Sequence, residues 1–321
     1  MMRKANRANS ALKRFIMTIL FLTITSLLLS ACGEEGTPAQ GSGKLKVTTT
    51  IGMITDVVNE VGGDYVEAVG LMGPGIDPHL YKASQGDVKK LDEADVIFYG
   101  GLHLEGKMAE MFESLEKSKP TVAVSSQIPE SSLRANPQGG NYSHDPHIWF
   151  NVKLWMSATE VIRDTLVEKD PAHKSVYMDR AAAYMAKLEE LDQYVRTQVG
   201  LIPEQSRILV TAHDAFGYFG DEYGMKVMGL QGMNTMSEYG SKDVSELRDF
   251  LVENKIKAVF IESSVPRKSI ESVIEGAKKL GHEVTIGGEL FSDAMGDAGT
   301  PEGTYIGMVK HNVDTIVNAL K

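Results

Sequence analysis

Two short stretches of the sequence place a histidine directly after Asp-Pro. The first is GIDPHLY at residues 75–81, which contains His79, and the second is HDPHIWF at residues 144–150, which contains His147. Proline pushes the residue before it into an extended conformation, so each histidine is presented from a stiff loop. Imidazole is a common ligand of divalent metal ions. The repeat is compatible with two convergent turns, and it equally suits two loops that offer histidines to one ligand.

Two further candidates follow β-rich runs in the second half of the chain. His213 ends the run that begins at residue 207, in ILVTAHDAFGYFG, and an acidic group follows residues 283–288, in GGELFSDAMGD. Open α/β folds bind ligands at the carboxyl ends of their strands, which favours both positions. An alternative for His213 is a bystander role beside a helix-capping Asp214. Spacing alone does not choose among the nearby acids, which are Glu289, Asp293 and Asp297.

The remaining histidines suit other roles. His103 follows a strand end and is a candidate for supporting a site or for the core, whereas His144 is expected in a solvated loop. A structural or surface role is expected for His173, His282 and His311.

Short β-rich runs alternate with helical patterns along the chain, which predicts an α/β fold with parallel sheets. The first series of strands is expected at 46–51, 65–71, 95–100 and 121–126. The second series is expected at 207–212, 226–231, 258–263 and 283–288. These two series predict two (β/α) lobes, over residues 44–170 and 203–321.

The segment between the lobes, residues 171–202, predicts one long helix. Apolar residues recur there at helical spacing, and no proline or glycine interrupts them before Gly200. A helix of about 27 residues is about 40 Å long, so it would join the lobes stiffly and limit hinge motion. The residues expected on its buried face are Val176, Ala183, Tyr184, Leu188, Leu191, Val195 and Val199. Both Asp-Pro-His stretches precede this helix and so belong to the first lobe.

The N-terminus predicts export and a lipid anchor. Residues 1–14 are basic, residues 15–29 are apolar but short for a bilayer span, and Leu-Ser-Ala then precedes Cys32, the only cysteine. We therefore expect a lipoprotein signal peptide over 1–31, lipidation of Cys32, and a flexible tether over 32–43 that leaves the protein on the extracytoplasmic face of the cell membrane. A chance cysteine after an ordinary signal peptide is the alternative.

The chain's formal net charge of −10 argues against nucleic-acid binding and suits a cationic ligand. Hydrophobic residues make up 42% and charged residues 24% of the 321 residues, which is ordinary for a globular protein.

Taken together, the lipobox, DPHLY, DPHIWF, TAHDAFGYF and LFSDAMG resemble, in this order, the TroA-like helical-backbone metal receptors of bacterial ABC importers. The resemblance covers nearly all of residues 44–321. It implies a non-enzymatic, monomeric solute-binding lipoprotein whose partners are an ABC permease and its ATPase. It also implies a metal site in the cleft between the lobes, with four ligands: His79, His147, His213 and Asp293.

Which ion is carried depends on weaker signals. Three histidines and one carboxylate suit tetrahedral Zn²⁺, whereas Mn²⁺ prefers more oxygen, which a bidentate Asp293 would supply in part. The residues of these motifs resemble those of manganese receptors, and the segment before His147 lacks the long His-rich loop of many zinc receptors. We therefore expect Mn²⁺, with Zn²⁺ as the alternative. Asp214 and Glu262 are candidates for holding the imidazoles in place.

Three other classes of protein are weaker alternatives. A secreted zinc hydrolase would keep an open coordination position, and the sequence has no His-Glu-x-x-His helix. A surface adhesin has no specific signal in the sequence. A siderophore or vitamin receptor would need a broad aromatic or basic cleft.

Overall fold

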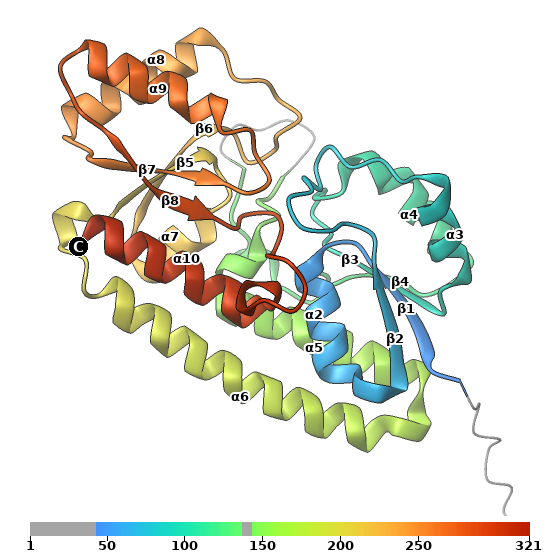
Figure 1. Ribbon diagram of the computed structural model, residues 1–321. Helices are drawn as coiled ribbons and strands as arrows, with labels where there is room; N and C mark the ends of the chain where they lie inside the picture. Colours follow the sequence, from blue (N-terminus) through green and yellow to red (C-terminus); the bar gives the residue numbers. More distant parts are fainter. Residues whose placement is uncertain (1–42, 137–142) are drawn as a thin grey trace, which may run out of the picture. The chain divides into compact units, whose positions relative to one another are not determined.

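The computed structural model describes residues 43–136 and 143–321, and Figure 1 shows two α/β lobes and a long helix within them. The fold class and the long connecting helix expected from the sequence are thereby confirmed. The expected signal peptide (1–31), Cys32 and all of the tether except Gly43 lie outside the described residues. Within the part that is described, no helix is both long and apolar enough to cross a bilayer.

Four parallel strands form the sheet of the first lobe, in the order β2-β1-β3-β4. They are β1 (Leu45–Thr49), β2 (Val66–Gly70), β3 (Val96–Tyr99) and β4 (Thr121–Ala123). The helices of this lobe's βα units are α2 (Gly52–Gly62), α3 (Gln85–Glu93) and α4 (Ala109–Leu115). Because the strands run in one direction, the loops at their carboxyl ends meet at one edge of the sheet.

The loop from β2 to α3 is fixed at its far end by a capping box. The Ser84 hydroxyl accepts a hydrogen bond from Asp87 N, and the Asp87 carboxylate accepts one from Ser84 N at 2.9 Å. Tyr81 OH also donates to Asp87 Oδ2 at 2.7 Å. The segment that carries His79 therefore ends in an ordered turn.

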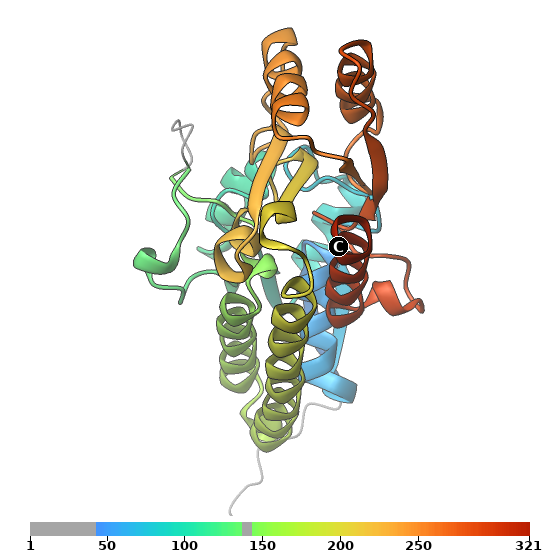
Figure 2. The same ribbon diagram turned by 90° about the vertical axis from the view of Figure 1, so that its left-hand side faces the viewer.

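Two long helices lie side by side below the sheets, α5 (Val152–Lys169) and α6 (Lys174–Val199), as Figure 2 shows. A 3₁₀ turn at Pro171–His173 joins them. The 26 residues of α6 correspond to a length of about 39 Å at 1.5 Å per residue. Its buried face contacts α2 and α5 of the first lobe and α10 (Tyr305–Leu320) of the second.

The buried face of α6 differs from the expected one in its first three turns. Ala183 is exposed and Val176 is only partly buried, whereas Tyr177 and Ala181 are buried. The Tyr177 ring can be buried because its hydroxyl donates to Asp170 Oδ2 at 2.6 Å. From Tyr184 onward the face follows the expected residues.

The second lobe is built from two parallel strand pairs, β5 with β6 and β7 with β8. The strands are β5 (Ile208–His213), β6 (Lys226–Gln231), β7 (Ala258–Glu262) and β8 (Thr285–Leu290). β5 lies against β7, so the four strands form one layer. The remaining helices are α7 (Gly217–Tyr223), α8 (Ser241–Glu253) and α9 (Lys268–Lys279).

One hydrophobic core spans both lobes, and a smaller one belongs to the second lobe. The large core runs from the first sheet through α5 and α6 to α10. The small core lies between the second layer of strands and the pair α8 and α9, and it includes Val210, Leu251 and Ile270. The lobes are therefore joined by continuous side-chain packing as well as by the connector helix.

Hydrogen bonds across this shared core involve Asp56 and Trp149. Asp56 Oδ2 accepts from Tyr305 N at 3.0 Å and from the Tyr184 hydroxyl at 3.4 Å. Tyr305 OH donates to the carbonyl of Trp149 at 2.7 Å, and Trp149 Nε1 donates to the carbonyl of Ser292 at 3.0 Å. These bonds link α2, α6 and the 3₁₀ turn before α5 (Ile148–Phe150) to the second lobe.

We expect Asp56→Asn to change how stability depends on pH. Burial raises the pKa of Asp56 from 3.8 to about 6, although the hydrogen bond from Tyr305 N acts to lower it. A carboxyl whose pKa is raised on folding stabilises the native state below pH 4, and this contribution is lost as pH rises through 6. Asparagine does not ionise but can still accept from Tyr305 N. Relative to the natural protein, the free energy of unfolding of the variant should rise by about 2 kcal/mol between pH 4.5 and pH 7.5. Urea denaturation at several pH values measures this, and parallel pH profiles would contradict it.

Candidate metal centre

Four buried side chains bring one donor atom each into a single cluster. His79, His147, His213 and Asp293 place these atoms within 4.8 Å of one another, and the side chains are 0–1% exposed. His79 and His147 come from loops of the first lobe. His213 is the last residue of β5, and Asp293 follows β8 in the second lobe. The cluster therefore consists of two ligand candidates from each lobe.

The spacing of the donor atoms suits one first-row metal ion. His147 Nε2 lies 3.4 Å from His79 Nε2 and 3.3 Å from Asp293 Oδ1. Asp293 Oδ2 lies 3.4 Å from His213 Nε2 and 3.6 Å from His79 Nε2. Bonds of 2.0–2.1 Å at tetrahedral angles put neighbouring ligand atoms about 3.3–3.4 Å apart.

The two Asp-Pro-His stretches share one local brace. Asp77 Oδ1 accepts a hydrogen bond from His79 N at 2.8 Å, and Asp145 Oδ1 accepts one from His147 N at 3.0 Å. A carboxylate that bonds the backbone two residues on forms an Asx turn. With proline between them, this turn fixes the histidine's backbone relative to the aspartate.

His147 has a carboxylate behind it that we did not name from the sequence. Asp145 Oδ1 lies 2.7 Å from His147 Nδ1, so Nε2 is the nitrogen that faces the centre. Asp145 is itself held by Arg134, whose Nη1 lies 3.4 Å from Oδ2, and by Tyr218 OH, which donates to its carbonyl at 2.9 Å. The signal was available, because Asp145 is the aspartate of the second Asp-Pro-His.

His213 is held by Glu262, the last residue of β7. Glu262 Oε1 accepts from His213 N at 2.8 Å, and Oε2 bonds Nδ1 of the imidazole. This again leaves Nε2 facing the centre. Asp214, the other residue named for such a role, hydrogen-bonds none of the four side chains in the described part of the chain; its backbone N bonds the carbonyl of Gln231.

Asp293 is fixed through its neighbour Ser292, whose carbonyl accepts from Trp149 Nε1 of the first lobe. Glu289 and Asp297, the competing acids, are exposed and lie outside the cluster. Both carboxylate oxygens of Asp293 lack a hydrogen-bond donor within residues 43–136 and 143–321. A buried carboxylate without donors is costly unless a cation is near.

The carboxylates around His147 and His213 favour their protonated imidazoles. Burial lowers the pKa of His147, but Asp145 and Asp293 outweigh burial and raise it to about 9. For His213, burial is likewise outweighed, by Glu262 and Asp293, and the pKa lies well above its usual value. The site therefore attracts positive charge at these two positions.

The pKa values of Asp293 and His79 shift in the directions that suit the binding of a cation. Burial raises the pKa of Asp293, but the adjacent His213 and His147 outweigh burial and hold it well below its usual range. Burial lowers the pKa of His79 to about 3, although the negative charge of Asp293 acts to raise it. The imidazole of His79 is therefore neutral. A divalent ion would take the place of the protons on His147 and His213.

The other histidines are held elsewhere. His173 Nδ1 lies 2.6 Å from Asp170 Oδ2, His282 Nε2 lies 2.6 Å from the carbonyl of Ile256, and His311 Nε2 lies 3.1 Å from that of Glu289. His103 and His144 line a separate cavity near α4. None of these five belongs to the cluster of His79, His147, His213 and Asp293 within the described residues.

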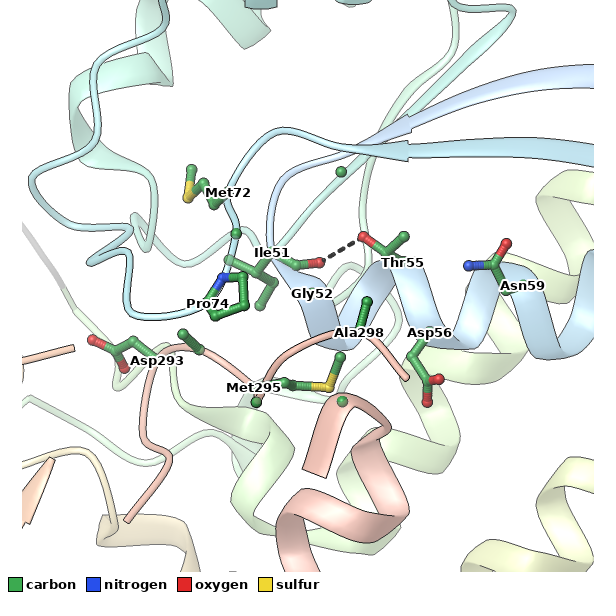
Figure 3. A pocket seen from close by; sticks show the side chains of 15 residues that line it. Ile51, Gly52, Thr55, Asp56, Asn59, Met72, Pro74, Asp293, Met295 and Ala298 are labelled. Atoms are coloured by element: carbon green, nitrogen blue, oxygen red, sulfur yellow. Dashed lines mark hydrogen bonds between the residues drawn. The ribbon is translucent and has the colours of Figure 1, made fainter. Parts of the chain in front are cut away.

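A cavity of 260 Å³ reaches the edge of the cluster (Figure 3). It lies between α2, the loop after β2 and the loop after β8, and Asp293 is the one member of the cluster that lines it. Thioether and small side chains such as Met72, Pro74 and Met295 make up much of its wall. The cavity is therefore a neighbour of the donor cluster and contains none of the three imidazoles.

The chain matches the family model described as zinc-uptake complex component A, periplasmic (ZnuA), over residues 47–319. The manganese-binding lipoprotein MntA of Bacillus subtilis (strain 168) is 50% identical over 303 residues, which are 94% of this chain and 97% of that protein. The zinc-binding protein TroA of Treponema pallidum (strain Nichols) is 48% identical over 308 residues, or 96% and 98% of the two chains. The iron ABC transporter substrate-binding lipoprotein MtsA of Streptococcus pyogenes serotype M1 is 34% identical over 308 residues, or 94% and 97%.

The solved structure of the periplasmic zinc-binding protein TroA from Treponema pallidum matches this fold with a TM-score of 0.84 at 50% sequence identity. The match covers 87% of this chain and 99% of that one. Sequence and fold thus agree over nearly the whole length of the relatives, and the chain belongs to the family of zinc-uptake complex component A.

Proposed function

We propose that this protein is an extracytoplasmic receptor that binds one divalent transition-metal ion between its lobes and delivers it to an ABC importer. The observation that carries the proposal is the cluster of three imidazoles and one carboxylate, buried and contributed by both lobes. The ion is cargo, with His79, His147, His213 and Asp293 as its ligands. Relatives named as metal-binding proteins and as an ABC transporter lipoprotein support this role.

Four protein ligands around one ion favour a receptor over a hydrolase. A catalytic zinc site keeps a position open for water, whereas here four donors already surround the centre. We therefore assign the residues around the cluster to binding and orientation and none to catalysis.

We propose Mn²⁺ as the transported ion, with Zn²⁺ as the alternative. Both oxygens of Asp293 face imidazole nitrogens, so the carboxylate can bind an ion through two oxygens and raise the coordination number, as Mn²⁺ prefers. The relative at 50% identity is named for manganese, and the one at 48% is named for zinc.

We further propose that the mature protein begins at Cys32 after removal of residues 1–31, and that acyl chains on Cys32 anchor it by the tether 32–43. Two of the relatives are named as lipoproteins. The domain limits that we propose for the remainder are 44–170 and 203–321 for the lobes and 171–202 for the connector. The working unit is a monomer that docks on a permease and its ATPase.

Replacing any one ligand should abolish tight binding. We expect His79→Ala, His147→Ala, His213→Ala and Asp293→Ala each to weaken Zn²⁺ binding by roughly 100-fold or more, because each removes a donor from a four-ligand set. Isothermal titration of the purified protein measures this. His173→Ala and His311→Ala are the matched controls and should stay within about threefold of the natural protein. Equal losses in both sets would refute the site.

Replacing a carboxylate that hydrogen-bonds an imidazole should weaken Zn²⁺ binding less than replacing a ligand does. It should weaken binding more than replacing a nearby acid that bonds no ligand. We expect Asp145→Asn and Glu262→Gln to weaken Zn²⁺ binding about 10–100-fold, because each then holds its imidazole less firmly and makes it less basic. Asp214→Asn, which changes a nearby acid that bonds no ligand, should have little effect. A loss at Asp214 equal to that at Glu262 would contradict the assignment.

Zinc should compete well against manganese in solution even if manganese is the physiological cargo. Affinity of a nitrogen and oxygen site is lowest for Mn²⁺ among these ions and much higher for Zn²⁺. We expect Zn²⁺ to displace bound Mn²⁺ from the purified protein, as followed by Mn²⁺ electron paramagnetic resonance. Retention of Mn²⁺ against equimolar Zn²⁺ would mean that the site imposes a higher coordination number than four donors provide.

A further inference from the structure

Asp77 connects the two lobes beside the metal cluster. Its Oδ1 braces the backbone of His79, and its Oδ2 accepts a hydrogen bond from the Thr235 hydroxyl at 2.6 Å. Asp77 lies in the loop after β2 of the first lobe, and Thr235 lies in the loop after β6 of the second. Thr235 is only 8% exposed, so water competes poorly for this bond.

The loop that carries Thr235 is itself tied to a ligand strand. Gln231 Nε2 donates to the carbonyls of Thr235 and Ser237, both at 2.7 Å. Gln231 ends β6 directly opposite His213 of β5. A continuous set of bonds therefore runs from the His79 loop, through Asp77 and Thr235, to the strand end that presents His213.

The two Asp-Pro-His aspartates use their oxygens differently. Asp145 bonds both the backbone N and the imidazole Nδ1 of His147. Asp77 bonds only the backbone N of His79, and the Nδ1 of His79 has no hydrogen-bond partner among the described residues. The second oxygen of Asp77 reaches across to the other lobe instead of supporting its own histidine.

We propose that Asp77 and Thr235 form a clasp that holds the His79 loop against the second lobe and so sets how fast the bound ion leaves. The proposal rests on the function proposed above. The four ligands are 0–1% exposed, so an ion can leave only when the loops around it separate. The clasp is formed without an ion, so the His79 loop must separate from the second lobe and break it before an ion leaves or enters. The clasp therefore slows dissociation, and it slows association as well because the loop must open first.

The test removes the hydroxyl and keeps the shape of the side chain. In Thr235→Val, Zn²⁺ should leave the full-length protein about tenfold faster, measured by stopped-flow transfer to a fluorescent chelator, because a hydrogen bond to a charged acceptor is lost. The association rate should rise as well, because the bond no longer holds the loop closed in metal-free protein. Thr235→Ser keeps the donor and should release Zn²⁺ at nearly the natural rate.

Tyr194→Phe is the matched control. It removes another hydroxyl-to-aspartate bond, from Tyr194 to Asp314, which joins α6 to α10 away from both Asp-Pro-His loops. Its release rate should not change. Release from Thr235→Val within twofold of the natural rate, or equal acceleration in Thr235→Val and Thr235→Ser, would overturn the clasp.

A second measurement needs no metal ion and separates this proposal from the proposed function. In metal-free protein, amides of residues 72–81 should exchange hydrogen faster in Thr235→Val than in the natural protein, Thr235→Ser or Tyr194→Phe. Unchanged exchange there refutes the clasp even if Zn²⁺ binds as proposed. Failure of the natural protein to bind any divalent ion refutes the proposed function. The exchange result then still tests whether the bond between Asp77 and Thr235 holds the His79 loop.

Discussion

A buried carboxylate without a hydrogen-bond donor, Asp293, is the constraint on which the rest of this structure depends. Its two oxygens face three imidazole nitrogens at 3.3–3.6 Å, and the residue is only 1% exposed. Such a group is tolerated only beside positive charge, from protonated imidazoles or from a metal ion. The same electrostatics explain why Asp145 and Glu262 lie behind the imidazoles, because each carboxylate orients a ring and increases its basicity. The protein thus surrounds a small space with negative charge and leaves the compensating charge to whatever occupies it.

The four donors stay at these distances only if the two lobes keep a fixed position relative to each other. The large core that runs through α5, α6 and α10 supplies this, because its side chains belong to both lobes and leave little freedom for a wide hinge. The bonds of Trp149 to Ser292 and of Tyr305 to Trp149 extend that packing up to the metal cluster. Motion that admits or releases an ion is then most easily accommodated in the loops after β2 and β6, at residues 73–80 and 232–240, which lie outside the shared core. This is a local mechanism, in contrast to closure of two independent domains.

The sequence was sufficient for features that depend on local rules and insufficient for those that depend on tertiary contact. Alternation of strands and helices identified both lobes, and the carboxyl-edge rule placed His213 and Glu262 at neighbouring strand ends. Spacing could not choose Asp293 over Glu289, because β8 ends at Leu290 and burial of the next turn depends on Trp149 from the other lobe. Resemblance to a family, not periodicity, singled out Asp293.

Two features that the sequence did not predict depend on hydrogen bonds that only the structure shows. In the first turn of α6 the apolar spacing predicted burial of Val176, whereas Tyr177 is buried and Asp170 accepts the hydrogen bond of its hydroxyl. For Asp145 the sequence shows only an aspartate before proline, which is typical of a turn residue. The structure gives it a second role, through the same oxygen that braces the backbone, and gives Asp77 a different second role through the other oxygen. The repeated tripeptide therefore encodes only the stiff presentation of histidine. What each aspartate does beyond that is set by what lies next to it: the ring of His147 in one case and a hydroxyl of the opposite lobe in the other.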